Sequence, residues 1–143
     1  MPQLPINFFI EDISFNLKRK ILLRKWVESC IKAEGYRLRE LNFIFCSDNY
    51  LLGINQEYLK HDTFTDIITF DNSEDDKLIA GDIFISVDRV NENAISFKVS
   101  RQDELHRVMI HGTLHLLGYP DKGKEAKAVM TKKENYYLAN RAV

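Results

Sequence analysis

The sequence predicts a single α+β domain, in which a small mixed sheet of about four strands packs against about five helices. A chain of 143 residues is of ordinary size for one domain. Apolar residues recur with helical spacing in some segments, and short β-branched or aromatic runs lie between these segments. No stretch has the composition of a linker, so we expect residues 1–143 to form one domain.

Four segments have the composition of β-strands. Each is short and rich in β-branched or aromatic side chains, which pack well on a pleated surface. The expected strands are Ile6–Ile10, Leu41–Cys46, Asp66–Phe70 and Ile83–Ser86. The acidic stretch Asp71–Lys77 separates the last two, and we expect it to form a turn.

Five segments show the periodicity or the end signals of helices. They are residues 17–34, 49–59, 88–97, 100–117 and 124–140. Ser47 or Asp48 is expected to cap the second helix, and Ser100 is expected to cap the fourth. Gly118 and Pro120 then end the fourth helix, because glycine favours the C-terminal turn and proline prevents the helix from resuming.

The composition excludes several classes of protein. The formal net charge is −1, so no overall basic field attracts nucleic acid, and any anionic partner needs a local site. Cys30 and Cys46 do not suggest a disulfide scaffold and are expected to be reduced core thiols. Residues 1–17 lack the basic start of a signal peptide, and no apolar run reaches the roughly 18 residues of a membrane span. We therefore expect a cytoplasmic protein with no membrane partner.

The motif HGTLHLLGYPD, residues 111–121, carries the chemistry. His111 and His115 are four residues apart on an expected helix, which places both imidazoles on one face within reach of one ion. The helix break that follows lets Asp121 return toward the same face. Two nitrogens and one carboxylate oxygen leave the fourth tetrahedral position of a zinc ion open for water, as in catalytic sites.

Other interpretations of these residues stay open. The two histidines can be a pair that only satisfies hydrogen bonds, and Asp121 can be a turn residue that touches no metal. The metal site is favoured because the helix is otherwise apolar and buried polar groups need partners. A zinc peptidase is disfavoured, since Gly112 stands where the HExxH motif places its glutamate base.

The same stretch resembles the YbeY-type family of bacterial single-strand endoribonucleases, which act in ribosomal RNA maturation. The family pattern HGxLHLxGYDH is matched here by His111, Gly112, Leu114, His115, Leu116, Gly118 and Tyr119. Residues 55–70, NQEYLKHDTFTDIITF, resemble the family's NxxYRxxDxPTDVLSF, and residues 81–86, GDIFIS, resemble its GDIxIS strand. Because order and spacing agree over most of the chain, the resemblance implies a zinc-hydrolase-like fold.

The sequence departs from the family pattern at three positions. Asp121 replaces the usual third histidine ligand, Leu59 replaces an arginine, and Phe64 replaces a proline. Aspartate is an accepted zinc ligand, so the first change preserves the site. The second change removes a cation that a phosphodiester site would use.

Arg107 is the first candidate to supply that cation, for both substrate binding and catalysis. It precedes His111 by one helical turn and can clamp a phosphate with its planar guanidinium. It can equally be a surface residue paired with Asp103. Lys60 and His61 flank the lost arginine position and are weaker candidates, the first for substrate binding and the second for moving protons.

Four further residues near the motif each allow two interpretations. Asp66 either orients a ligand or caps a turn. Lys122, Lys124 and Lys127 form either a modest basic rim or an ordinary solvated helix face.

The resemblance implies a metal-dependent, single-strand-specific endoribonuclease that holds one zinc, or another divalent metal, per chain. Its substrate would be single-stranded RNA in ribosomal RNA processing, at the 3′ end of the small-subunit RNA. Its partners would be ribosomal RNA, ribosomal proteins or a ribosome-associated GTPase. Two alternatives stay open: a metal-dependent hydrolase of another substrate, as the missing arginine would suggest, and a non-catalytic ribosome-assembly factor with a bound metal.

Overall fold

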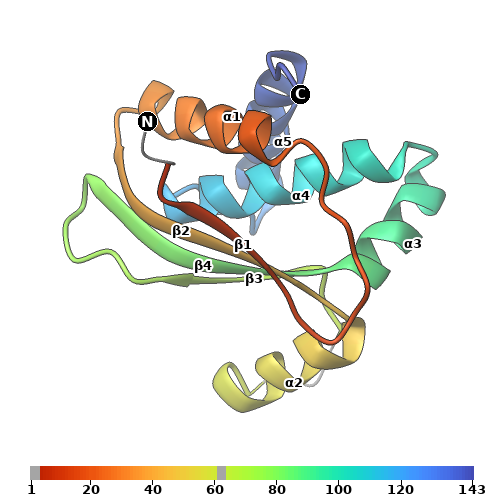
Figure 1. Ribbon diagram of the computed structural model, residues 1–143. Helices are drawn as coiled ribbons and strands as arrows, with labels where there is room; N and C mark the ends of the chain where they lie inside the picture. The colour runs from red at the N-terminus through yellow and green to blue at the C-terminus, as the bar shows by residue number, and fades with distance from the viewer. Residues whose placement is uncertain (1–3, 61–63) are drawn as a thin grey trace.

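The fold is a four-stranded mixed sheet with helices on both faces (Figure 1). The computed structural model describes residues 4–60 and 64–143. The elements follow one another as β1 (Ile6–Ile10), α1 (Lys20–Ala33), β2 (Arg37–Cys46), α2 (Asp48–Tyr58), β3 (Ile67–Asp71), β4 (Leu78–Ser86), α3 (Val87–Phe97), α4 (Arg101–Leu116) and α5 (Lys124–Ala139). The predicted α+β class, with four strands and five helices, is confirmed for the described residues.

The strands lie in the order β1-β2-β4-β3. β2 pairs in parallel with both β1 and β4, whereas β3 pairs antiparallel with β4. Helices α1, α4 and α5 cover one face of the sheet, and α2 packs on the opposite face (Figure 1). The main core lies on the first face and includes Phe43 and Phe45 of β2 and Met109 and Ile110 of α4, all fully buried.

Most element ends lie within one residue of the predicted positions, but three segments differ more. α1 begins at Lys20 and not at residue 17, because Arg19 adopts a left-handed backbone (φ 60°) that a helix cannot contain. β2 and β4 extend further toward their N-terminal ends, where Arg37 pairs with Leu78. The added part of β2 is largely polar and exposed, so composition alone does not mark it as a strand.

Serine side chains cap the N-termini of α2 and α4. The hydroxyl of Ser47 accepts a hydrogen bond from the backbone N–H of Tyr50, and that of Ser100 accepts one from Asp103. Both predicted caps are thereby confirmed. Cys30 is buried and free, as is Cys46 on β2. Among the residues that the structure describes, no helix is both long and apolar enough to cross a membrane.

Candidate metal centre

Helix α4 lies very close to the sheet at Gly112. A Cβ atom at this position would lie 2.7 Å from Cδ1 of Ile67 and 2.9 Å from Cγ2 of Ile83, which is closer than carbon atoms can pack. Glycine therefore has a packing role here. The close approach brings His111 and His115 beside β3, and residues of both elements line one cleft.

The turn after α4 determines where Asp121 lies. Gly118 has a left-handed backbone (φ 99°), and the N–H of Tyr119 donates to the carbonyl of Leu114 at 3.1 Å, which closes the helix in a Schellman arrangement. The hydroxyl of Tyr119 then donates to the carboxylate of Glu34 at the end of α1, at 2.5 Å. These contacts anchor the loop that carries Asp121.

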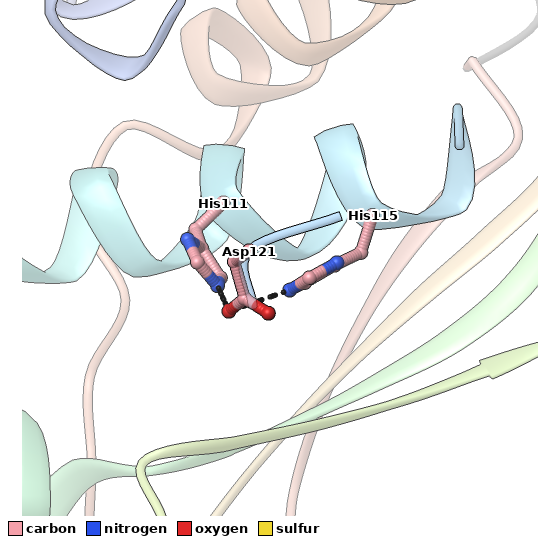
Figure 2. A group of neighbouring side chains, drawn as sticks. All are labelled: His111, His115 and Asp121. Atoms are coloured by element: carbon pink, nitrogen blue, oxygen red, sulfur yellow. Dashed lines mark hydrogen bonds and ion pairs between the residues drawn. The ribbon is translucent and has the colours of Figure 1, made fainter. Parts of the chain in front are cut away.

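The three residues proposed as ligands converge on one point. Figure 2 shows both imidazoles on the same side of α4, with the carboxylate of Asp121 between their tips. Nε2 of His111 and Nε2 of His115 each lie 3.2 Å from Oδ2 of Asp121. A tetrahedral ion with bonds of about 2.1 Å, such as zinc, separates its ligand atoms by about 3.4 Å. The spacing of these donor atoms therefore suits a small divalent cation.

A second carboxylate fixes the orientation of His111. Nδ1 of His111 donates to Oε2 of Glu134 on α5 at 2.6 Å, and Glu134 is only 6% exposed. In the neutral ring this bond would leave Nε2 without a proton, so that Nε2 and an oxygen of Asp121, 3.2 Å apart, would face each other as two acceptors. A metal ion between them would satisfy both, and metal-bound histidines commonly donate their other N–H to a carboxylate in this way.

The electrostatics of His111 favour positive charge at this point. Burial by itself would lower the pKa of the imidazole, but the hydrogen bond and charge of Glu134, together with the charges of Asp121 and Asp66, raise it above its ordinary value. A group of carboxylates that favours a proton on the ring also favours a bound cation beside it. The donor set and its surroundings therefore fit a divalent metal.

Sequence reasoning missed Glu134, although the sequence contains a signal for it. Glu134 lies on the same face of α5 as the buried residues Met130, four residues before it, and Tyr137, three residues after it. A charged residue within an apolar stripe needs a buried partner. The pattern indicates that such a partner exists, but it cannot name His111, which is 23 residues away.

A cleft of about 440 Å³ opens beside the three residues. Among the described residues, its lining contains no lysine or arginine. Leu59 belongs to the lining, so an arginine at that position would face the cleft. Asp66 also lines it, and burial raises the pKa of this carboxyl against the opposing effect of His111. The described part of the lining thus supplies a protonatable carboxyl group but no lysine or arginine side chain.

Two other predicted site residues, Arg107 and Lys60, lie outside this lining. Arg107 donates from Nη1 to Glu134 at 2.8 Å and from Nη2 to Asn135 at 2.7 Å. Its alternative partner, Asp103, accepts instead from Arg141. Lys60 is exposed just after α2 and is not part of the cleft wall. His61 lies outside the described residues.

Comparison with known proteins decides the family. Residues 7–142 match the family model described as endoribonuclease YbeY. The chain belongs to the YbeY family. A YbeY endoribonuclease of Amoebophilus asiaticus is 49% identical over 144 residues, covering 100% of this chain and 98% of the relative. One from Cytophaga hutchinsonii is 50% identical over 141 residues, covering 99% of each.

The fold agrees with a solved structure. The solution structure of TM1509 from Thermotoga maritima superposes with a TM-score of 0.65 at 31% sequence identity, covering 93% of this chain and 86% of that protein. The resemblance to the YbeY family that the motif suggested is therefore confirmed by full-length similarity and supported by fold.

Proposed function

We propose that this chain is a metal-dependent endoribonuclease that hydrolyses single-stranded RNA. The observation that carries the proposal is the convergence of His111, His115 and Asp121 beside an open cleft. Relatives about half identical in sequence are named endoribonucleases, which supports RNA as the substrate. One zinc per chain suits a donor set of two imidazole nitrogens and one carboxylate oxygen, and another divalent metal is the alternative.

The chemistry would divide between the ion and the residues of the cleft. A divalent ion held by His111, His115 and Asp121 would lower the pKa of a bound water toward neutrality and would polarise a phosphoryl oxygen. Glu134 keeps the ring of His111 oriented. The carboxyl of Asp66, whose pKa burial raises, would accept a proton within the cleft. His61 stays a second candidate for moving protons.

The apolar rim of the cleft suits an unpaired nucleotide. Phe64 is 52% exposed and Leu59 is 42% exposed, and both line the cleft. An exposed aromatic ring stacks on any nucleobase, which favours single strands because their bases are not already stacked in a duplex. We therefore assign Phe64 to base stacking and Leu59 to the wall of that subsite.

The biological setting belongs to the same proposal. Ribosomal RNA would be the substrate, with the 3′ end of the small-subunit RNA as the processed region. Ribosomal proteins or a ribosome-associated GTPase would bring the enzyme to that RNA. Such a substrate would place the protein in the cytoplasm.

A second candidate function is the hydrolysis of another, less charged substrate. It is favoured by one observation: among the described residues, the cleft wall offers no cation to a phosphodiester. A binding protein that uses the metal only structurally is the non-catalytic alternative.

One set of measurements tests these candidates. Elemental analysis of the purified protein should find about one zinc per chain, and a labelled single-stranded RNA should be cut while its duplex form is not. His115→Ala should lose both metal and cleavage. Cleavage of a small phosphodiester or a peptide with RNA left intact would instead support the second candidate. No hydrolysis of any substrate by fully loaded protein would support the binding protein.

A further inference from the structure

The first turns of α5 carry a group of exposed lysines. Lys124, Lys127 and Lys132 line one shallow groove of about 570 Å³, together with Thr131 and Asn135. Lys127 follows Lys124 by three residues and Lys132 follows five residues later, and all three border the same groove. We call Lys124, Lys127 and Lys132 the α5 basic face.

These lysines differ from two arginines that lie near residues of the metal centre and the cleft, because each of those arginines has a carboxylate partner. Arg107 is paired with Glu134, and Arg89, whose guanidinium lies 5.7 Å from the ring of Phe64, is paired with Asp48 at 2.8 Å. Within the part of the chain that the structure describes, the lysines of the α5 basic face have no carboxylate partner within 4 Å. Their charge is therefore available to an anion from outside.

The α5 basic face adjoins the proposed metal centre. Lys124 follows Asp121 by three residues, which is at most about 11 Å of chain. From Lys124 to Lys132 the helix rises about 12 Å. The groove ends at Asn135, whose side-chain oxygen accepts a hydrogen bond from Arg107. A row of positive charge thus leads away from the metal ligands along α5, in a protein whose net charge is −1.

We propose that the α5 basic face binds the sugar–phosphate backbone of a single-stranded RNA whose scissile bond lies in the cleft. This inference rests on the proposed function. Lysines contact phosphates as point charges and need no particular base, so the contact is independent of sequence. It supplies positive charge outside a cleft whose described lining, with Leu59 in place of the family's arginine, contains no lysine or arginine.

Salt dependence of RNA binding tests this inference. The test variant is the triple substitution Lys124→Gln, Lys127→Gln and Lys132→Gln. The control is the triple substitution Lys18→Gln, Lys20→Gln and Lys25→Gln, which removes the same charge from exposed lysines at and before α1. The dissociation constant of a fluorescein-labelled single-stranded oligoribonucleotide is measured by anisotropy at several salt concentrations, with EDTA present to prevent cleavage.

The expected result is a change in slope confined to the α5 variant. Each lost phosphate contact lowers the slope of log Kd against log salt by about 0.7, so three should lower it by about 2. The α1 control should keep the slope of the unmodified protein, and replacing the three α5 lysines by arginine should restore it.

Two results would overturn the inference. The first is an equal slope for the α5 variant and the unmodified protein. The second is an equal decrease in slope for the α5 and α1 variants, because the decrease would then depend on net charge alone. Cleavage of RNA by the unmodified protein is measured separately in the presence of zinc. If that cleavage persists while the slope is unchanged, the α5 inference fails and the proposed function stands; if cleavage is absent, the proposed function fails.

Discussion

Of the three histidines on helix α4, His106 and His111 lie five residues apart and have opposite surroundings. His106 is 2% exposed, packs against Trp26 with ring centroids 5.8 Å apart, and accepts a hydrogen bond at Nδ1 from Arg141. Burial, together with the positive charge of Arg141, lowers the pKa of His106 to about 4. It is therefore a neutral core residue at physiological pH.

His111 has carboxylates around it where His106 has a guanidinium. Glu134 and Asp121 both contact its ring, and their charges raise its pKa. The difference teaches that a histidine on a largely buried helix is not in itself a sign of a metal site. What distinguishes His111 is a second donor one turn later, His115, and acids that favour positive charge; the residue one turn after His106 is Ile110.

Removing a proposed ligand should have the largest effect. His111→Ala or His115→Ala should reduce metal affinity by more than about 100-fold, since even residues that only support a ligand are worth 10–100-fold. His106→Gln should leave metal content unchanged. Competition with a chelator and elemental analysis measure both. Full metal occupancy in the His111 or His115 variant would contradict the proposed difference between His111 and His106.

Glu134→Gln tests whether the carboxylate behind the ring makes His111 different. The amide keeps the size of the side chain but removes the negative charge, so metal affinity should fall by about 10–100-fold. Glu125→Gln, an exposed acid on the same helix, is the matched control and should change affinity little. Glu134→Asp should recover part of the loss. Equal affinities for the Glu134→Gln and Glu125→Gln proteins would mean that Glu134 does not support the site.

His106→Gln should change how stability depends on pH. Above about pH 6.5 the histidine is neutral in both folded and unfolded chains. As pH falls from about 6.5 to about 4, this histidine is protonated in the unfolded chain but stays neutral in the folded protein. The free energy of unfolding of the unmodified protein therefore falls by up to about 1.4 kcal/mol per pH unit. The variant lacks this loss, and its stability deficit at neutral pH should shrink on acidification.

Urea unfolding of the metal-free proteins at several pH values measures this difference. Glu104, whose pKa burial raises to about 6, acts in the opposite direction, since its folded form gains a proton first as pH falls. It is present in both proteins, so its contribution cancels when the two are compared. A stability deficit that is constant from pH 4 to 7 would show that His106 is not held neutral.

Arg107→Gln should have the smallest effect. Because Glu134 and Asn135 already hold this guanidinium, it should contribute no more than one phosphate contact, and the salt slope of RNA binding should fall by at most about 0.7. Metal affinity should change only a few-fold. The anisotropy assay used for the α5 basic face measures the slope, and an unchanged slope would leave Arg107 only the role of balancing the charge of Glu134.

Local information in the sequence predicted most of the fold and the core of the candidate site. Helical periodicity, serine caps and the glycine after α4 act within a few residues, so element types and most ends follow from them. The i, i+4 spacing of His111 and His115 and the short turn to Asp121 are local in the same sense. These three residues could therefore be brought together from the sequence alone.

Tertiary structure decided everything that depends on contacts between elements. The packing of α5 on α4 brings Glu134 into contact with His111 and Arg107. The position of Arg141, just after α5, likewise brings it into contact with His106. The placement of Leu59 and Asp66 in one cleft likewise requires α2 and the start of β3 to meet α4. No periodicity encodes such pairs, because their energy depends on distances between side chains that only the packed chain defines.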